Sequence, residues 1–201
     1  MVEHRKSEWY GECAVISDKY DDYVQVKYKC NGTGTLYDYS LFPGINLIFM
    51  DFNCSDIFHE PIPNKNIIEI RHYQKGRVEF ELRNNKVFHM KEGELCINAL
   101  ANVPAAYSFP FGYSVGLSCV IDKDSIDAKT KQIFSYYNID VLNLGQELEI
   151  EKKWFLCRTP QRLLHIFDEL YAAKGMEGKD YFRIKLLELF YHIKQLRIED
   201  Q

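Results

Sequence analysis

The chain has 201 residues, of which 46% are hydrophobic and 27% are charged. This composition is close to that of an average globular protein, so it excludes wholesale disorder, collagen-like repeats and coiled-coil composition. Lys and Arg number 25 against 29 Asp and Glu, and the resulting net charge of -4 has the wrong sign for a chain built mainly to coat phosphates. We expect a folded domain of ordinary size, with or without a small appendage.

The six cysteines are spread along the chain without a CxxC pair or a tight cluster. They are Cys13, Cys30, Cys54, Cys96, Cys119 and Cys157. This spacing indicates neither a zinc knuckle nor a dense disulfide framework, and reduced thiols are the simpler interpretation. The N-terminus is polar and no run is long enough to span a bilayer, so we expect a cytoplasmic protein with no membrane contact.

Between about residues 10 and 121, short runs rich in Val, Ile, Tyr and Phe are separated by turn signals. These signals are Asn31-Gly32, Pro43-Gly44, Lys75-Gly76, Asn84-Asn85, Glu92-Gly93 and Phe111-Gly112. Tight turns join antiparallel neighbours, so the spacing predicts an antiparallel sandwich or barrel. The best-defined strands are expected at 67–73, 77–83, 86–90 and 94–98, and the alternation of Val78, Phe80 and Leu82 with charged residues marks the second of them.

Beyond Ile121 the apolar period changes to that of helices. A first helix is expected after the cap Asp124-Ser125, and a second begins at Thr159 as N-cap, with Pro160 in its first turn, and stops near Gly175. A third is expected over 179–198. We therefore divide the chain into a β-barrel domain, 1–121, and a helical segment, 122–201.

The third helix carries apolar residues on two faces. The first stripe is Phe182, Leu186, Leu189, Ile193 and Leu196, and the second is Ile184, Leu187, Tyr191 and Ile198. A helix that is apolar on two faces has more surface to bury than one side of its own domain can cover. We therefore predict a homodimer with the first stripe as its interface. The alternative is a central helix that its own chain covers on both sides. The sequence stops right after this helix without a Gly or Asn cap, as expected of a piece of a longer protein.

Several segments resemble the N-terminal cupin domain of AraC/XylS-type transcriptional regulators. They are residues 67–79, IIEIRHYQKGRVE, residues 91–98, KEGELCIN, and residues 116–122, GLSCVID. Residues 183–189, RIKLLEL, resemble the interdomain and dimerisation helix of the same family. The resemblance implies a mainly β fold, a cupin-like double-stranded β-helix (jelly-roll) barrel followed by C-terminal helices. It also implies effector sensing, dimerisation and a following DNA-binding domain with two helix-turn-helix motifs, which this sequence does not contain.

Metal-using cupins hold a divalent ion with a His-x-His pair, a Glu and a distant His. Alignment on Glu69 places these histidines at Pro63, Lys65 and near Pro104, none of which supplies an imidazole. A single carboxylate is too little for a metal site, so we predict no metal and no cofactor.

Enzymatic motifs are missing as well. The sequence has no Gly-x-Ser-x-Gly elbow, no Gly-x-Gly-x-x-Gly opening a helix and no Walker-type motif, and the glycine-rich segment 31–35 is interpreted as a hairpin turn or loop. We expect a protein that is not an enzyme. The alternatives are a metal-dependent cupin enzyme, such as a sugar isomerase or a small dioxygenase, and a stand-alone interaction module.

A barrel interior would be open to an unidentified small-molecule effector. If Glu69 points inward, as the resemblance implies, then Arg71 and Tyr73 share its face, and Tyr107 and Phe109 are candidates for an aromatic wall. These five residues form the predicted ligand-binding site. The alternation equally permits the opposite register, with Ile68, Ile70 and His72 inside, and Glu69 with Arg71 could equally be a structural ion pair.

Overall fold

The computed structural model describes residue 10 and residues 13–58, 66–82, 87–99 and 104–201. The strands are β1 (Ala14–Lys19), β2 (Val24–Tyr28), β3 (Gly32–Phe42), β4 (Ile45–Cys54), β5 (Asp56–Phe58), β6 (Ile67–Leu82), β7 (Val87–Lys91), β8 (Glu94–Ala99), β9 (Pro104–Ser108), β10 (Ser114–Asp122) and β11 (Phe155–Arg158). The α-helices are α2 (Ala128–Tyr136), α3 (Gln161–Ala173) and α4 (Lys179–Ile193), with short 3-10 turns at η2 (Lys123–Ser125), η3 (Gln146–Leu148) and η4 (Ile198–Asp200).

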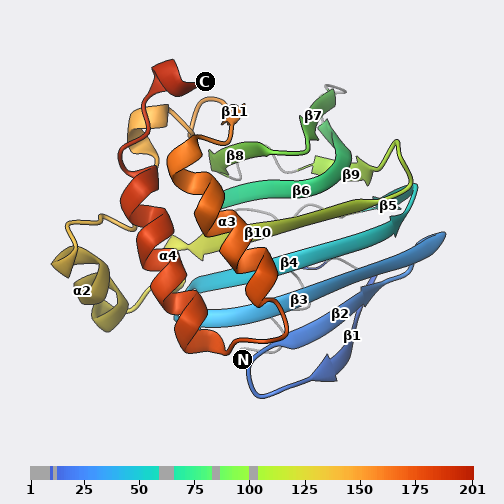
Figure 1. Cartoon of the computed structure of the whole chain (residues 1–201), viewed down its shortest axis with the longest axis horizontal. Helices are drawn as coiled ribbons and strands as arrows, with labels where there is room; N and C mark the ends of the chain where they lie inside the picture. Colours follow the sequence, from blue (N-terminus) through green and yellow to red (C-terminus); the bar gives the residue numbers. More distant parts are fainter. Residues whose placement is uncertain (1–9, 11–12, 59–65, 83–86, 100–103) are drawn as a thin grey trace.

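The strands form a curled antiparallel sheet whose main path runs β1-β2-β3-β4-β10-β6-β8-β11. The second half of β6 leaves this path and pairs with β7 and β9, and β9 in turn pairs with β5. Figure 1 shows α3 and α4 lying side by side against one face of the curled sheet. The predicted mainly β, cupin-like fold with C-terminal helices is confirmed. One strand, β11, comes from the chain beyond residue 121 and pairs with β8.

The turn predicted at Lys75-Gly76 is wrong, because β6 runs without interruption from Ile67 to Leu82. Gly76 has a positive φ of 87° and pairs with Ser114 of β10, and a Cβ at this position would lie 2.5 Å from the Tyr113 carbonyl oxygen. Glycine therefore allows a bend inside the strand rather than a reversal. The bend lets the first half of β6 pair with β10 and β8 and the second half pair with β7 and β9.

Of the glycine-rich segment 31–35, predicted as a turn or loop, only Asn31 lies in the β2–β3 connection, since Gly32 begins β3 and Gly34 lies within it. Gly34 pairs with Phe52 of β4, and a Cβ on Gly34 would lie 2.8 Å from the Phe52 ring. The glycine makes room for an aromatic ring inside the barrel, which is a packing role.

The helices differ from the predictions at their ends. Asp127, rather than Asp124-Ser125, caps α2 by accepting a hydrogen bond of 2.7 Å from the Thr130 backbone N–H. At α3 the N-cap position is Pro160, with no side-chain cap, so the predicted Thr159 cap is wrong. The last helix ends at Ile193 instead of 198, and the backbone is extended again at Arg197.

The stripe predicted to form the dimer interface lies inside the chain's own core. Phe182, Leu186, Leu189, Ile193 and Leu196 are each at most 1% exposed. The Phe182 ring, for example, lies 4.8 Å from the Tyr39 ring and 5.6 Å from the Phe49 ring of the sheet. We correct the prediction for these five residues: α4 and Leu196 just after it pack this stripe into the core, so the stripe offers no surface to a second subunit. Among the described residues, no helix is long and apolar enough to cross a membrane.

Candidate functional site

A cavity of about 60 Å³ lies inside the curled sheet. Its lining residues are Tyr28, Leu36, Ile48, Met50, Phe52, Ile57, Glu69, Arg71, Tyr73, Tyr107, Phe109 and Ser118. The five residues of the predicted ligand-binding site are all in this set, so strands β6 and β9 and the segment after β9 bring them together as expected from the sequence. Most of the wall is aromatic or aliphatic, and the charged groups come from Glu69 and Arg71.

The register of β6 explains how these charges come to face the cavity. Glu69, Arg71 and Tyr73 point inward, whereas the alternate residues Ile68 and Ile70 belong to the core between the sheet and the helices. Neither set is in water: Glu69 is 3% exposed and Ile70 is 0% exposed. Of the two registers considered, the one with Glu69 and Arg71 facing inward is observed, and α3 and α4 cover the opposite face.

The two charges form a buried ion pair. Arg71 Nε lies 2.7 Å from Glu69 Oε1, and the Ser118 hydroxyl of β10 donates a hydrogen bond to the same carboxylate oxygen. Arg71 Nη2 donates a hydrogen bond of 3.1 Å to the Tyr107 hydroxyl. The guanidinium also lies 5.0 Å from the centre of the Phe80 ring, within range of a cation–π interaction. Arg71 is therefore fixed by groups from three parts of the barrel.

The protonation states in the cavity follow from burial and from this pair. Burial alone would lower the pKa of Arg71, but the Glu69 carboxylate outweighs it and raises that pKa well above the ordinary value. Burial also raises the pKa of the Tyr107 and Tyr73 hydroxyls, which therefore stay protonated. The cavity thus offers a permanent cation together with neutral phenol groups.

The ion pair is not fully satisfied. Among the described residues, Glu69 Oε2 and Arg71 Nη1 are buried and have no hydrogen-bond partner. Buried polar atoms in proteins are paired in the great majority of cases, and an unpaired one costs about 1–3 kcal/mol. A hydroxyl group or a water molecule carries both an acceptor, which Arg71 Nη1 lacks, and a donor, which Glu69 Oε2 lacks.

The size of the cavity limits what enters without rearrangement. Ligand pockets usually have about 300–1,000 Å³, whereas this cavity of about 60 Å³ holds only a few water molecules. Tyr28, Met50 and Tyr107 are the described lining residues that are only partly buried. Binding of an organic molecule here requires a shift of side chains.

A second polar cluster inside the barrel was not anticipated from the sequence. Asp38 of β3 is 2% exposed, receives a hydrogen bond from the Tyr10 hydroxyl, and accepts another of 2.6 Å from Asn46 Nδ2 of β4. Asp38 pairs with Ile48, whose side chain lines the cavity. The signal in the sequence was a single carboxylate within the run Leu36-Tyr37-Asp38-Tyr39, which is otherwise apolar or aromatic.

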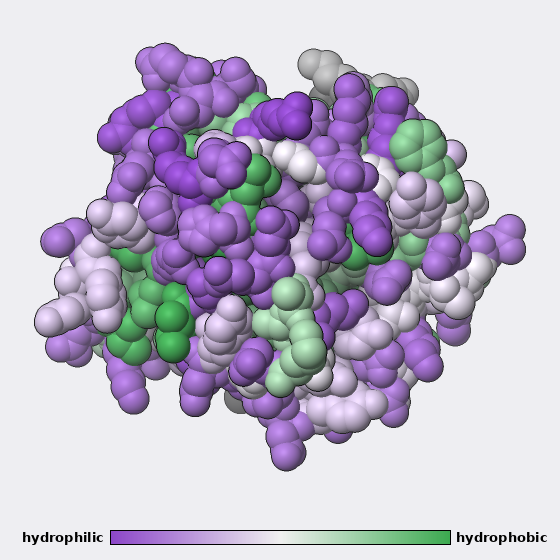
Figure 2. Space-filling view, in the orientation of Figure 1, coloured by the Kyte–Doolittle hydropathy of each residue, from purple (hydrophilic) through white to green (hydrophobic). Residues whose placement is uncertain are grey.

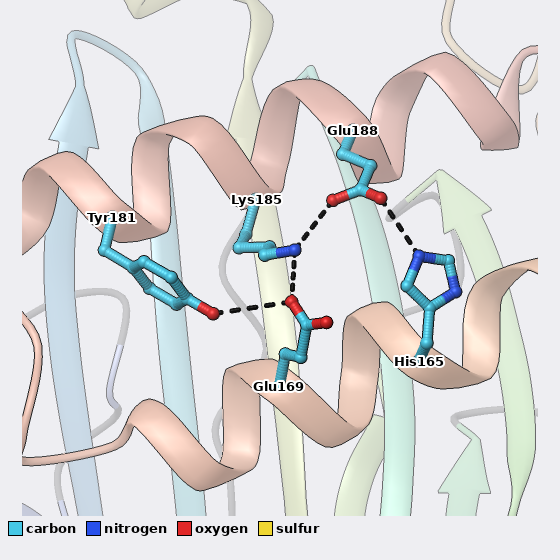
Figure 3. A network of polar contacts seen from close by, with 5 residues as sticks. All are labelled: His165, Glu169, Tyr181, Lys185 and Glu188. Atoms are coloured by element: carbon cyan, nitrogen blue, oxygen red, sulfur yellow. Dashed lines mark hydrogen bonds and ion pairs between the residues drawn. The ribbon is translucent and has the colours of Figure 1, made fainter.

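On the outer surface, α3 and α4 are joined by the polar network drawn in Figure 3. Lys185 of α4 forms ion pairs with Glu169 of α3 and, at 2.9 Å, with Glu188. Glu188 also lies 3.0 Å from His165 Nε2 of α3, and the Tyr181 hydroxyl donates a hydrogen bond of 3.4 Å to Glu169. These contacts tie the two helices together at the side that faces solvent.

Glu188→Gln should lower the free energy of unfolding by less than about 1 kcal/mol, because partly exposed ion pairs are screened by water. The loss should shrink at high salt, which weakens the wild-type pairs. Urea denaturation at low and high salt measures both effects, with Glu92→Gln at the exposed β7–β8 turn as the control. A loss that is equal at both salt concentrations would show that the charge of Glu188 does not contribute.

No metal-binding cluster of three or more His, Cys, Asp or Glu side chains occurs in the described part of the chain. Pro63 and Lys65, where a metal-using cupin would carry its paired histidines, lie outside the described residues. Glu69, the remaining carboxylate of that pattern, is already engaged by Arg71 and Ser118.

No family model and no curated protein matches the sequence. Solved structures similar to the chain include AraC-like regulators, as the sequence resemblance implied. One is the AraC-like transcriptional activator CuxR, with 7% identity over 91% of this chain and 61% of that chain and a TM-score of 0.47. Another is ToxT from Vibrio cholerae O395 bound to (E)-4-(8-methylnaphthalen-1-yl)but-3-enoic acid, with 8% identity over 76% of this chain and 57% of that chain and a TM-score of 0.45.

Cupin domains of other regulators are similar over a shorter stretch. The cupin domain of an XRE family transcriptional regulator from Enterobacter cloacae is 12% identical over 44% of this chain and 94% of that chain, with a TM-score of 0.36. The chain therefore spans less than two thirds of the two AraC-like regulators and nearly all of an isolated cupin domain.

Proposed function

We propose that the chain is the effector-sensing and dimerising part of an AraC/XylS-type transcriptional regulator. It is a cytoplasmic homodimer without enzymatic activity, and a separate helix-turn-helix domain makes the DNA contacts. The observation that carries the proposal is the buried pair Glu69–Arg71, whose unpaired atoms lie at a cavity with an apolar wall. A buried pair that is incompletely satisfied is costly as a purely structural feature and well suited to a ligand with a polar group.

The position of the cavity supports a sensing role. Strand β6 carries Arg71 on its inner side, and the next residue, His72, stacks on Phe167 of α3 with the ring centres 4.1 Å apart. Tyr171 of α3 also donates a hydrogen bond of 2.9 Å to the His72 carbonyl oxygen. A ligand that shifts β6 therefore changes the packing of α3, and through the α3–α4 network the position of α4. Such coupling requires that the ligand bind the two arrangements with different affinity.

Dimerisation is assigned to the outer face of α4, since its inner stripe is buried. Ile184 is 63% exposed and Tyr191 is 46% exposed, with Tyr137 of the neighbouring segment 50% exposed. Figure 2 shows a mostly hydrophilic surface on this side, with an apolar area where α2 and α4 meet. A second copy that packs the same face against it would bury these side chains in a symmetric contact.

Ile184→Glu should convert a dimer into a monomer, because it places a charge in the proposed contact. Val87→Glu is the matched control, since Val87 is equally 63% exposed and lies on β7, away from α4. Sedimentation velocity over a range of concentrations measures both variants. A wild-type chain that stays monomeric at the highest concentration, or an Ile184→Glu variant that stays dimeric, contradicts this assignment.

Effector binding is tested by a thermal-shift screen of sugars, aryl acids and other small metabolites. A ligand of the cavity should stabilise the wild-type chain and fail to stabilise Met50→Trp, in which the larger side chain fills the cavity. Val87→Trp, at an exposed position, should respond like the wild type. A ligand that stabilises Met50→Trp and the wild type equally does not bind in this cavity, and the sensing proposal then fails for that ligand.

A further inference from the structure

Two of the six cysteines, Cys30 and Cys54, meet at one end of the barrel. Cys54 is the last residue of β4 and is 4% exposed, whereas Cys30 lies in the β2–β3 connection and is partly exposed. Both residues belong to one apolar cluster of the barrel, and burial and, after it, the neighbouring Cys30 raise the pKa of Cys54. The backbone keeps them close, because Gly32 pairs with Cys54 and its N–H donates to the Cys30 carbonyl oxygen at 3.0 Å.

The absence of a side chain at Gly32 makes this approach possible. A Cβ on Gly32 would lie 3.1 Å from Cys54 Cβ and 2.0 Å from the Asn53 carbonyl oxygen, so no larger residue fits at this position beside Cys54. Gly32 therefore brings the β2–β3 connection that carries Cys30 close to the end of β4 that carries Cys54. A disulfide needs two thiols on closely opposed backbones, and strand neighbours at a sheet end can provide that separation.

We propose that Cys30 and Cys54 are a redox-sensitive pair that a hydroperoxide converts into a disulfide. The Cys30 thiolate attacks the peroxide, so that an S–O bond forms, the O–O bond breaks and water or an alcohol leaves. The Cys54 thiol then attacks the oxidised sulfur; the S–S bond forms, the S–O bond breaks, and the hydroxyl group leaves as water with the Cys54 proton. Two thiols are oxidised and one peroxide is reduced, so the step balances.

The order of the two steps follows from exposure. Cys30 is the more accessible of the two thiols. Burial, and to a smaller extent the neighbouring Cys30, raises the pKa of Cys54 to about 12, so its thiol stays protonated. Cys54 therefore reacts only after Cys30 has been oxidised beside it. Disulfides of this regulatory, reversible kind are the ones expected in a reducing compartment.

The pair lies close in sequence to residues that line the cavity. Phe52 and Ile57, on either side of Cys54 in the chain, line the cavity, and so does Tyr28 just before Cys30. A disulfide would tie the β2–β3 connection to the β4–β5 corner and hold these walls in one arrangement. Oxidation would thus act on the same cavity by a route that needs no effector.

The test is to treat the reduced full chain with hydrogen peroxide and count free thiols after denaturation. We expect the count to fall from six to four, the intact mass to fall by two hydrogens, and a peptide that links Cys30 to Cys54, all reversed by dithiothreitol. Cys30→Ser and Cys54→Ala should each abolish the link. Cys13→Ser is the matched control, because Cys13 is also partly exposed and its carbonyl oxygen accepts a hydrogen bond from the backbone N–H of Lys29, next to Cys30.

A linked peptide that contains Cys13 instead of Cys54 would overturn the proposal. So would peroxide treatment that only adds oxygen atoms, or a thiol loss that is the same in Cys54→Ala as in the wild type. The thiol count is independent of any effector, so its failure leaves the proposed sensing function untouched.

Discussion

Arg71→Met should lower the free energy of unfolding by about 3–5 kcal/mol, because it leaves the Glu69 carboxylate buried without its counter-charge. Glu69 is 3% exposed, and its other polar contact in the structure is the Ser118 hydroxyl. Methionine matches the length of the arginine stem, so the loss reports on charge rather than on a large cavity. Urea denaturation near neutral pH, followed by circular dichroism, measures the change.

The double variant Glu69→Gln with Arg71→Met separates the cost of an unpaired charge from the value of the pair. Removal of both charges should recover most of the lost stability, since a buried ion pair and a neutral replacement are often similar in free energy. Tyr107→Phe, which removes one hydrogen bond of Arg71, should cost about 1 kcal/mol. If Arg71→Met is as stable as the wild type, water reaches Glu69 and the pair is not the buried feature that the proposed function needs.

The inward residues were predictable because a strand alternates its faces. Once the resemblance placed Glu69 inside, Arg71 and Tyr73 followed by the period of two, and the structure puts all three at the cavity. The alternation does not show which face of a strand is exposed to solvent. Neither face of β6 is exposed, because two helices from a distant part of the chain cover the face that carries Ile70.

The sequence was less informative where a local signal has two physical meanings. Lys75-Gly76 has the composition of a turn, but the same positive φ of glycine also permits a bend inside a long strand. The apolar stripe of α4 showed that Phe182 and Leu189 must be buried, and only the tertiary packing decides whether the sheet or a second subunit buries them. The closeness of Cys30 and Cys54 could not be predicted, because it depends on the pairing of β3 with β4.

His72 should make the chain sensitive to acid. It lies between β6 and α3, is 4% exposed, and burial lowers its pKa to about 4. Its Nδ1 lies 3.1 Å from the Tyr171 hydroxyl, and its ring stacks on Phe167, so the neighbours in contact with it carry no charge that would stabilise the protonated form. The neutral imidazole is therefore part of the contact that joins β6 to α3.

His72 makes stability depend on pH because the folded chain binds a proton at this residue only at a lower pH than the unfolded chain does. Above pH 6.5 His72 is neutral in the folded and the unfolded chain, so it adds no pH dependence. Between pH 6.5 and about 4 the unfolded chain is protonated there and the folded chain is not, so stability falls as the pH falls. At about 1.4 kcal/mol per pH unit, the loss attributable to His72 is about 3 kcal/mol when the pH reaches 4.

His72→Phe isolates this contribution, because phenylalanine can still stack on Phe167 but binds no proton. The variant should be less stable than the wild type at pH 7.5, where it lacks the contact with Tyr171, and should gain on the wild type by about 3 kcal/mol as the pH falls to 4. Urea denaturation of both proteins across this pH range measures the difference in their free energies of unfolding. The contributions of the carboxylates are the same in both proteins and drop out of this difference. Val87→Phe, at a 63% exposed position on β7 without a titratable side chain, is the control and should run parallel to the wild type. If the curves of wild type and His72→Phe are parallel as well, His72 is reached by water in the folded chain, and β6 is not sealed against α3 at the point where a ligand-induced shift would have to pass.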